Sequence, residues 1–171
     1  MNFLSRLFGK REDALAQVRP LWHRVVEIAR EKAWYAEYGV ADTVPGRFDA
    51  ITLVLALVLL RMERDEELME SSVRLTEIFV DDMDGQLRES GIGDLVVGKH
   101  IGRLMGTLGG RMGALREALP QDDAALAEVL ARNITLIEGA EPARLVQAAR
   151  ALADTLAATG ADDLMAARIA R

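Results

Sequence analysis

The chain has 171 residues, of which 50% are apolar and 5% aromatic, and it carries a net charge of −6 with no cysteine. Its length fits one domain with a sizeable core. The absence of cysteine excludes disulfides, a thiol nucleophile and cysteine metal sites, and the negative charge argues against nucleic-acid binding.

The N-terminal end of the chain is an amphipathic segment. In a helix it would place four apolar side chains on one face beside basic residues; these are Phe3, Leu4, Leu7 and Phe8. Such a segment can lie on an anionic membrane surface, or it can be a short helix docked on the protein body or a frayed tail. We therefore divide the chain into this segment, residues 1–11, and a single helical domain, residues 12–171.

No stretch is long enough to cross a membrane as a helix, and no cleavable signal peptide is evident. The longest apolar run, residues 51–60, is about half of what a bilayer crossing needs. We expect a cytoplasmic protein that can also lie at the periphery of the inner membrane.

Apolar periodicity predicts a first long helix over residues 12–36. Pro20 lies within it, so we expect a kink or a break at that point. Residues 37–47 form a loop with turn-forming glycine and proline. Residues 47–63 form a helix that is apolar on nearly every side, which predicts that it is the central one.

The next helix begins at Asp65 and lies in the acidic part of an otherwise nearly balanced chain. Residues 61–90 hold ten acids and four bases, a net charge of −6. Near the end of this helix, which we expect to reach residue 89, lie three aspartates: Asp81, Asp82 and Asp84. They predict either a solvated acidic face or a contact patch for a basic partner. Arg88 can pair with Asp84, and Asp94 can cap the helix that follows.

A stripe of glycine marks the helix predicted over residues 95–119. Gly98, Gly102, Gly106 and Gly110 recur at i+4 spacing. Because each costs roughly 1 kcal/mol relative to alanine inside a helix, some contact should offset the loss. We favour close packing of another helix of the same chain on the stripe, and the alternative is a shallow groove for a partner's hydrophobic helix.

Two more helices are predicted over residues 122–137 and from Pro142 to before Gly160, with a short tail helix from Asp162. Strand signals are poor throughout. The predicted fold class is therefore all-α, a single-domain helical bundle of about six to seven helices.

Residue patterns for catalysis, metals or cofactors are sparse. The aspartates lack the spacing of a calcium loop, and the chain has no nucleophile elbow, phosphate-binding loop or metal-binding histidine pair. We expect that the protein is not an enzyme and that it binds no metal and no cofactor. An enzyme acting through carboxylates would need a deep pocket lined by Asp82, Asp84 or Asp94.

Two motifs resemble those of the ubiquinol–cytochrome c chaperone family. The first is Tyr38-Gly39-Val40-x-Asp42-Thr43, followed by Gly46-Arg47-Phe48. The second comprises Asp81-Asp82-Met83-Asp84, Leu87-Arg88-Glu89, Gly91-x-Gly93-Asp94 and Val97-Gly98-Lys99. The resemblance spans about residues 34–112. The chain departs from the family at Leu108-Gly109-Gly110-Arg111, where members commonly carry an aromatic pair before Gly-Arg, and it lacks a later tyrosine.

The resemblance implies a helical, non-enzymatic assembly factor of the cytochrome bc1 complex. Its client would be newly made cytochrome b or another bc1 subunit, held without ATP or covalent chemistry, and a second assembly factor could be a further partner. The short N-terminus without a transit segment looks bacterial. The candidate partner-binding residues are Asp42, Arg47, Asp81, Asp82, Asp84, Arg88, Asp94, Lys99, Gly102 and Gly106. The alternative function is a general helical protein-interaction scaffold unrelated to respiration.

Overall fold

The structure is a computed structural model that describes the backbone of residues 3–89 and 94–171 and the side chains of residues 12–85 and 99–171. The described chain is helical, without a strand. Its elements are α1 (Phe3–Ala29), α2 (Lys32–Ala36), α3 (Val44–Met62), the 3₁₀ turn η1 (Glu66–Leu68), α4 (Met69–Glu89), α5 (Asp94–Ala118), α6 (Asp123–Asn133), α7 (Ala143–Ala158) and α8 (Ala161–Met165). The predicted all-α, single-domain fold is confirmed.

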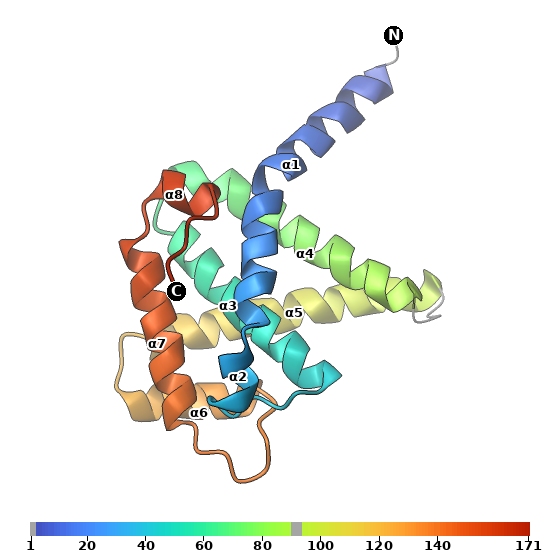
Figure 1. The fold of residues 1–171 in the computed structure, drawn as a ribbon. Coiled ribbons are helices and arrows are strands. Elements are labelled where there is room, and N and C mark those ends of the chain that lie inside the picture. Colours follow the sequence, from blue (N-terminus) through green and yellow to red (C-terminus); the bar gives the residue numbers. More distant parts are fainter. Residues whose placement is uncertain (1–2, 90–93) are drawn as a thin grey trace.

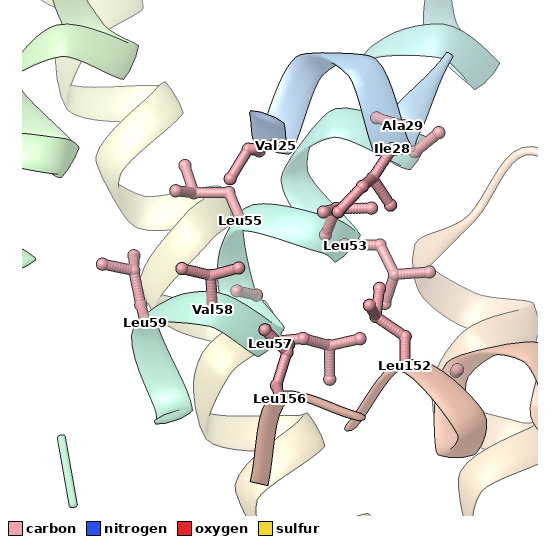
Figure 2. Close-up of a cluster of buried hydrophobic side chains, with 14 of the residues drawn as sticks. Val25, Ile28, Ala29, Leu53, Leu55, Leu57, Val58, Leu59, Leu152 and Leu156 are labelled. Atoms are coloured by element: carbon pink, nitrogen blue, oxygen red, sulfur yellow. The ribbon is translucent and has the colours of Figure 1, made fainter. Parts of the chain in front are cut away.

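Helix α3 lies at the centre of the bundle, as its apolar sequence predicts. It contacts α1, α5 and α7, so that almost every face is covered (Figure 1). Figure 2 shows leucines of α3 meeting Val25 and Ile28 of α1 and Leu152 and Leu156 of α7. Burying each such side chain stabilises the fold by about 1.5–3 kcal/mol, so α3 holds the surrounding helices together.

The first helix ends earlier than its periodicity predicts. It runs through Pro20 to Ala29 and changes direction along its length, as expected of a helix with an interior proline (Figure 1). The indole of the buried Trp34 donates to the Ile28 carbonyl at 2.7 Å, and the Tyr35 hydroxyl donates to the Ala29 carbonyl at 2.8 Å. These bonds satisfy carbonyls at the end of α1, and α2 follows as a separate short helix.

The N-terminal part of α1 projects from the body of the molecule (Figure 1). Phe3, Leu4, Leu7 and Phe8 lie on this part, and their side chains are outside the described residues. Their contact with a membrane, and the division of the chain at residue 11, therefore stay predictions. In the described parts of the chain, no helix is both long and apolar enough to span a membrane.

The helix predicted over residues 122–137 ends at Asn133, because the following residues pair with a distant loop. The Ala41 amide donates to the Thr135 carbonyl, and the Ile137 amide donates to the Gly39 carbonyl, each at 2.9 Å. This pairing fastens the loop after α2 to the loop after α6. Sequence periodicity along one segment does not report such a long-range contact.

Candidate functional site

An apolar groove lies between α4 and α5, two helices that contact one another and that converge toward one end in Figure 1. Two adjoining hollows form it and share Val73, Thr76 and Met105. The remaining lining residues are Leu59, Glu63, Ser72, Glu77, Val80, Asp81, Ile101, Leu108, Gly109 and Met112. We refer to this surface as the α4–α5 groove.

Large apolar side chains are exposed in this groove. Val73 is 55% exposed and Met105 is 43% exposed. Val73, Thr76 and Val80 recur at three- and four-residue spacing, so they share one face of α4. Leu75 and Phe79 of the same helix are buried in the core. Helix α4 therefore has a second apolar face, which is typical of a surface that binds another protein.

The described glycines of the stripe, with the neighbouring Gly109, form the outer side of α5 beside the groove, whereas Gly98 lies outside the residues whose burial is described. Gly102, Gly106, Gly109 and Gly110 are exposed, and a Cβ atom added at any of them would meet nothing within 4 Å. The favoured interpretation, close packing within the chain, is therefore wrong for these glycines. The reason is geometric: α5 packs on the core through the face of Leu108 and Leu115, and the glycines lie on other faces.

Substituting glycines of the stripe should stabilise the free protein. Gly102→Ala and Gly106→Ala should each raise the free energy of unfolding by about 0.5–1 kcal/mol, because alanine favours the helix and the space is open. Urea denaturation measures this. Gly46→Ala is the opposite control, since its Cβ would lie 1.9 Å from the Ala41 carbonyl oxygen and should destabilise. A loss of stability at Gly102 or Gly106 would mean that the stripe is covered.

The three aspartates of the predicted acidic patch lie in different surroundings. Asp81 lines the groove together with Glu77. Asp82 instead accepts a hydrogen bond from the Trp22 indole at 2.7 Å, which fastens α4 to α1. Asp84 is half-buried. Successive residues of a helix point about 100° apart, so only Asp81 contributes to the edge of the groove, and a role of Asp82 and Asp84 in binding stays a prediction.

Other predicted contact residues are only partly placed. Lys99 is exposed near the start of α5. The side chains of Arg88 and Asp94 lie outside the described residues, as does the turn between α4 and α5.

Next to the groove, the Arg74 guanidinium pairs with the Glu77 carboxylate at 3.1 Å, and its hydrogen bond to Glu77 raises the pKa of Arg74. Among the side chains that are described, no group of three or more acidic or histidine residues could hold a metal ion.

Most of the first motif builds the loop between α2 and α3. Gly39 has φ +81°, a left-handed conformation that favours glycine. Gly46 lies so close to the backbone of Ala41 that a side chain would not fit. The Thr43 hydroxyl accepts a hydrogen bond from the Gly46 amide and so caps α3. The fold therefore accounts for the residue types at Gly39, Thr43 and Gly46.

Asp42 and Arg47 of the same motif form an exposed ion pair away from the α4–α5 groove. Their side-chain atoms are 2.7 Å apart. The hydrogen bond from Arg47 lowers the pKa of Asp42, and the same bond raises the pKa of Arg47. The pair lines a different hollow from the groove. The predicted partner-binding residues therefore fall on at least two surfaces.

A buried ion pair that was missed in the sequence sets the position of α5. Arg111 on α5 is 8% exposed and Asp49 on α3 is 7% exposed. The guanidinium donates to the Asp49 carboxylate at 2.5 Å and also to the Thr52 hydroxyl. The other carboxylate oxygen accepts from the Thr135 amide at 2.8 Å and from its hydroxyl at 2.6 Å. The sequence does contain a signal for this ion pair: Asp49 and Arg111 are charged residues on otherwise apolar helix faces.

Comparisons with known proteins agree with this architecture. The sequence profile of the family described as Ubiquinol-cytochrome C chaperone matches residues 36–171. A solved structure, described as the crystal structure of the Cbp3 homolog from Brucella abortus, is 32% identical, with a TM-score of 0.79. The similarity covers 98% of this chain and 96% of that chain. No curated protein matches the chain.

Proposed function

The chain belongs to the ubiquinol–cytochrome C chaperone family, and on that premise we propose that it holds newly made cytochrome b, or another subunit of the bc1 complex, in the α4–α5 groove during assembly. The single observation that carries the choice of site is the exposed apolar lining of that groove, with Val73 and Met105 at its centre.

The groove matches the chemistry of such a client. Membrane subunits contain apolar helices that must be kept from aggregating before they enter the bilayer. An amphipathic or apolar helix can lie along an apolar groove and bury its side chains there. Each Å² of apolar surface removed from water contributes about 25 cal/mol. In this proposal the affinity comes from burial, and neither a nucleotide nor a covalent step is needed.

The glycine stripe beside the groove favours a helical client. With no side chain at Gly102 and Gly106, the backbone of a second helix can approach α5 closely, as in small-xxx-small contacts. In the free protein these glycines cost stability without a compensating contact. Client binding would supply that contact, which is a physical reason for glycine at these positions.

Acidic side chains along α4 would add orientation. Glu77 and Asp81 line the groove on the α4 side, and Glu77 is also paired with Arg74 in the free protein. Apolar helices of membrane proteins are commonly flanked by lysine and arginine on the cytoplasmic side. Such flanking charges would meet the acidic edge while the apolar part lies in the groove. The projecting end of α1, with Phe3, Leu7 and Phe8, would keep the protein at the membrane periphery where the client emerges.

Affinity purification from the native host tests this proposal. The tagged chain is recovered from membranes solubilised in mild detergent, and bc1 subunits are identified by mass spectrometry. We expect cytochrome b or another bc1 subunit in the wild-type eluate. Each single variant, Glu77→Gln or Asp81→Asn, should recover less of it. The control Asp154→Asn, which removes one exposed carboxylate on α7, should recover an unchanged amount. Deletion of the gene should lower bc1 levels.

The same experiment separates the alternatives. A soluble partner in the eluate, together with normal bc1 levels after deletion, would support a general interaction scaffold and contradict an assembly role. A second assembly factor would be recovered as a further protein present in amounts similar to the client.

A further inference from the structure

A second hollow is lined by residues from the end of α1, from α2 and from the start of α3; Figure 1 shows the course of these helices. It is lined by Arg30, Lys32, Tyr35, Ala36, Asp42 and Arg47, and we refer to it as the basic hollow. Its volume is about 490 Å³, and all of its lining residues except Tyr35 are exposed, so it is an open hollow on the surface. None of these residues lines the α4–α5 groove.

The basic hollow carries the opposite charge to the chain as a whole. It has three cationic side chains and one carboxylate, a net charge of +2, in a chain of net charge −6. Arg47 is paired with Asp42. Arg30 and Lys32 are exposed and form no ion pair with any other described side chain. Two positive charges are therefore available to a ligand.

Tyr35 forms a fixed and uncharged wall of the basic hollow. Its ring is half-buried, and its hydroxyl donates to the Ala29 carbonyl at 2.8 Å. Burial raises the pKa of Tyr35, so its hydroxyl stays protonated at neutral pH and adds no negative charge. The ring offers an apolar surface next to the cationic side chains.

The segments around the basic hollow are held in place from both sides. Beside α2, Arg171 pairs with Glu31 and lies over the Trp34 ring at 5.7 Å. The loop that carries Asp42 is tied to residues 135–137 by backbone hydrogen bonds. A preformed site loses less entropy when a ligand binds. The fold thus holds in place the backbone segments that carry these charges before any ligand arrives.

We infer that the basic hollow binds a phosphate-bearing group, with Arg30, Lys32 and Arg47 opposite the phosphate oxygens and the Tyr35 ring against the adjoining carbon atoms. Guanidinium groups donate two parallel hydrogen bonds to phosphate, and a lysine ammonium adds a point charge. The net charge of +2 matches a phosphate dianion. The phosphate could belong to a soluble molecule or to a lipid headgroup, and the inference does not depend on the proposed client.

Titration of the full-length protein at constant ionic strength tests the inference. The soluble probes are inorganic phosphate and glycerol 3-phosphate, followed by calorimetry or by NMR shifts of residues 30–47. The membrane probes are vesicles of phosphatidylglycerol and, for comparison, of phosphatidylcholine. Saturable binding of the soluble phosphates would identify a soluble ligand and support the site. Binding to phosphatidylglycerol vesicles alone supports a headgroup site only when it weakens on replacement of Arg30 and Lys32, because the N-terminal end of α1 can also bind anionic vesicles.

Variants show whether the basic hollow is responsible. Arg30→Gln with Lys32→Gln should weaken binding at least about tenfold, because two charge-assisted contacts are lost. Arg103→Gln with Arg144→Gln removes the same charge from exposed positions elsewhere and should leave binding unchanged. Asp42→Asn should tighten binding, since it removes the carboxylate that competes for Arg47. If Asp42 and Arg47 only stabilised the fold, Asp42→Asn would not tighten binding of the phosphate.

Two results would overturn the inference: no saturable binding of any probe, or equal losses in the two double variants. Recovery of bc1 subunits by the Arg30→Gln, Lys32→Gln variant is measured in parallel. The inference and the proposed function can thus fail separately.

Discussion

Replacing Asp49 with alanine is expected to lower the free energy of unfolding by about 3–5 kcal/mol, because the substitution leaves the Arg111 guanidinium buried without its counter-charge. It also removes the acceptor of the Thr135 amide and hydroxyl, so the loop after α6 loses its attachment to α3. Urea denaturation followed by circular dichroism measures the change.

Two controls separate the buried charge from a general effect of removing a carboxylate. Glu63→Ala breaks the exposed pair with Arg116 and should cost no more than about 1 kcal/mol. Asp49→Ala combined with Arg111→Met replaces the whole pair with apolar groups and should recover much of the loss. A cost below about 1 kcal/mol for Asp49→Ala alone would show that this ion pair does not hold α5 on α3.

Placing glutamate in the groove at both Val73 and Met105 is expected to reduce client recovery more than about tenfold. Two carboxylates in the groove must lose water when an apolar helix covers them, and that cost exceeds 1.4 kcal/mol, which corresponds to a factor of ten. Recovery of bc1 subunits in affinity purification measures the loss, and bc1 levels in a complemented deletion strain report its consequence.

The fold should tolerate these substitutions, since Val73 and Met105 are both about half exposed. Val44→Glu with Ile137→Glu is the matched control, because it adds the same charge at exposed apolar positions outside the groove. Normal client recovery by the folded Val73→Glu, Met105→Glu variant would place the client elsewhere on the molecule. Equal losses in the two variants would indicate an effect of net charge.

The helical fold and its centre could be predicted because their signals are local. Residues 51–60 are apolar on all sides, and only a helix surrounded by others can bury such a segment. Where helices end was harder to predict. Ala29 ends α1 because the Trp34 indole and the Tyr35 hydroxyl take the carbonyls at its end, and Asn133 ends α6 because the next residues pair with residues 39–41.

The candidate site was only partly predictable, because its parts meet through tertiary contacts. The glycine spacing identified one face of α5, but spacing cannot tell whether another helix covers that face, and the favoured interpretation was wrong. Three neighbouring aspartates suggested one patch, yet Asp82 binds Trp22, 60 positions earlier. Asp49 and Arg111 are 62 positions apart, so neither predicts the other locally.

Site-specific photo-crosslinking from position 105 in growing cells tests most directly whether the client lies in the α4–α5 groove. A photoreactive residue replaces Met105, and Ile137, an exposed apolar residue outside the groove, serves as the control position. We expect a crosslink between position 105 and cytochrome b or another bc1 subunit, and none from position 137. Crosslinks of equal yield from both positions, or to bc1 subunits from position 137 alone, would contradict the account.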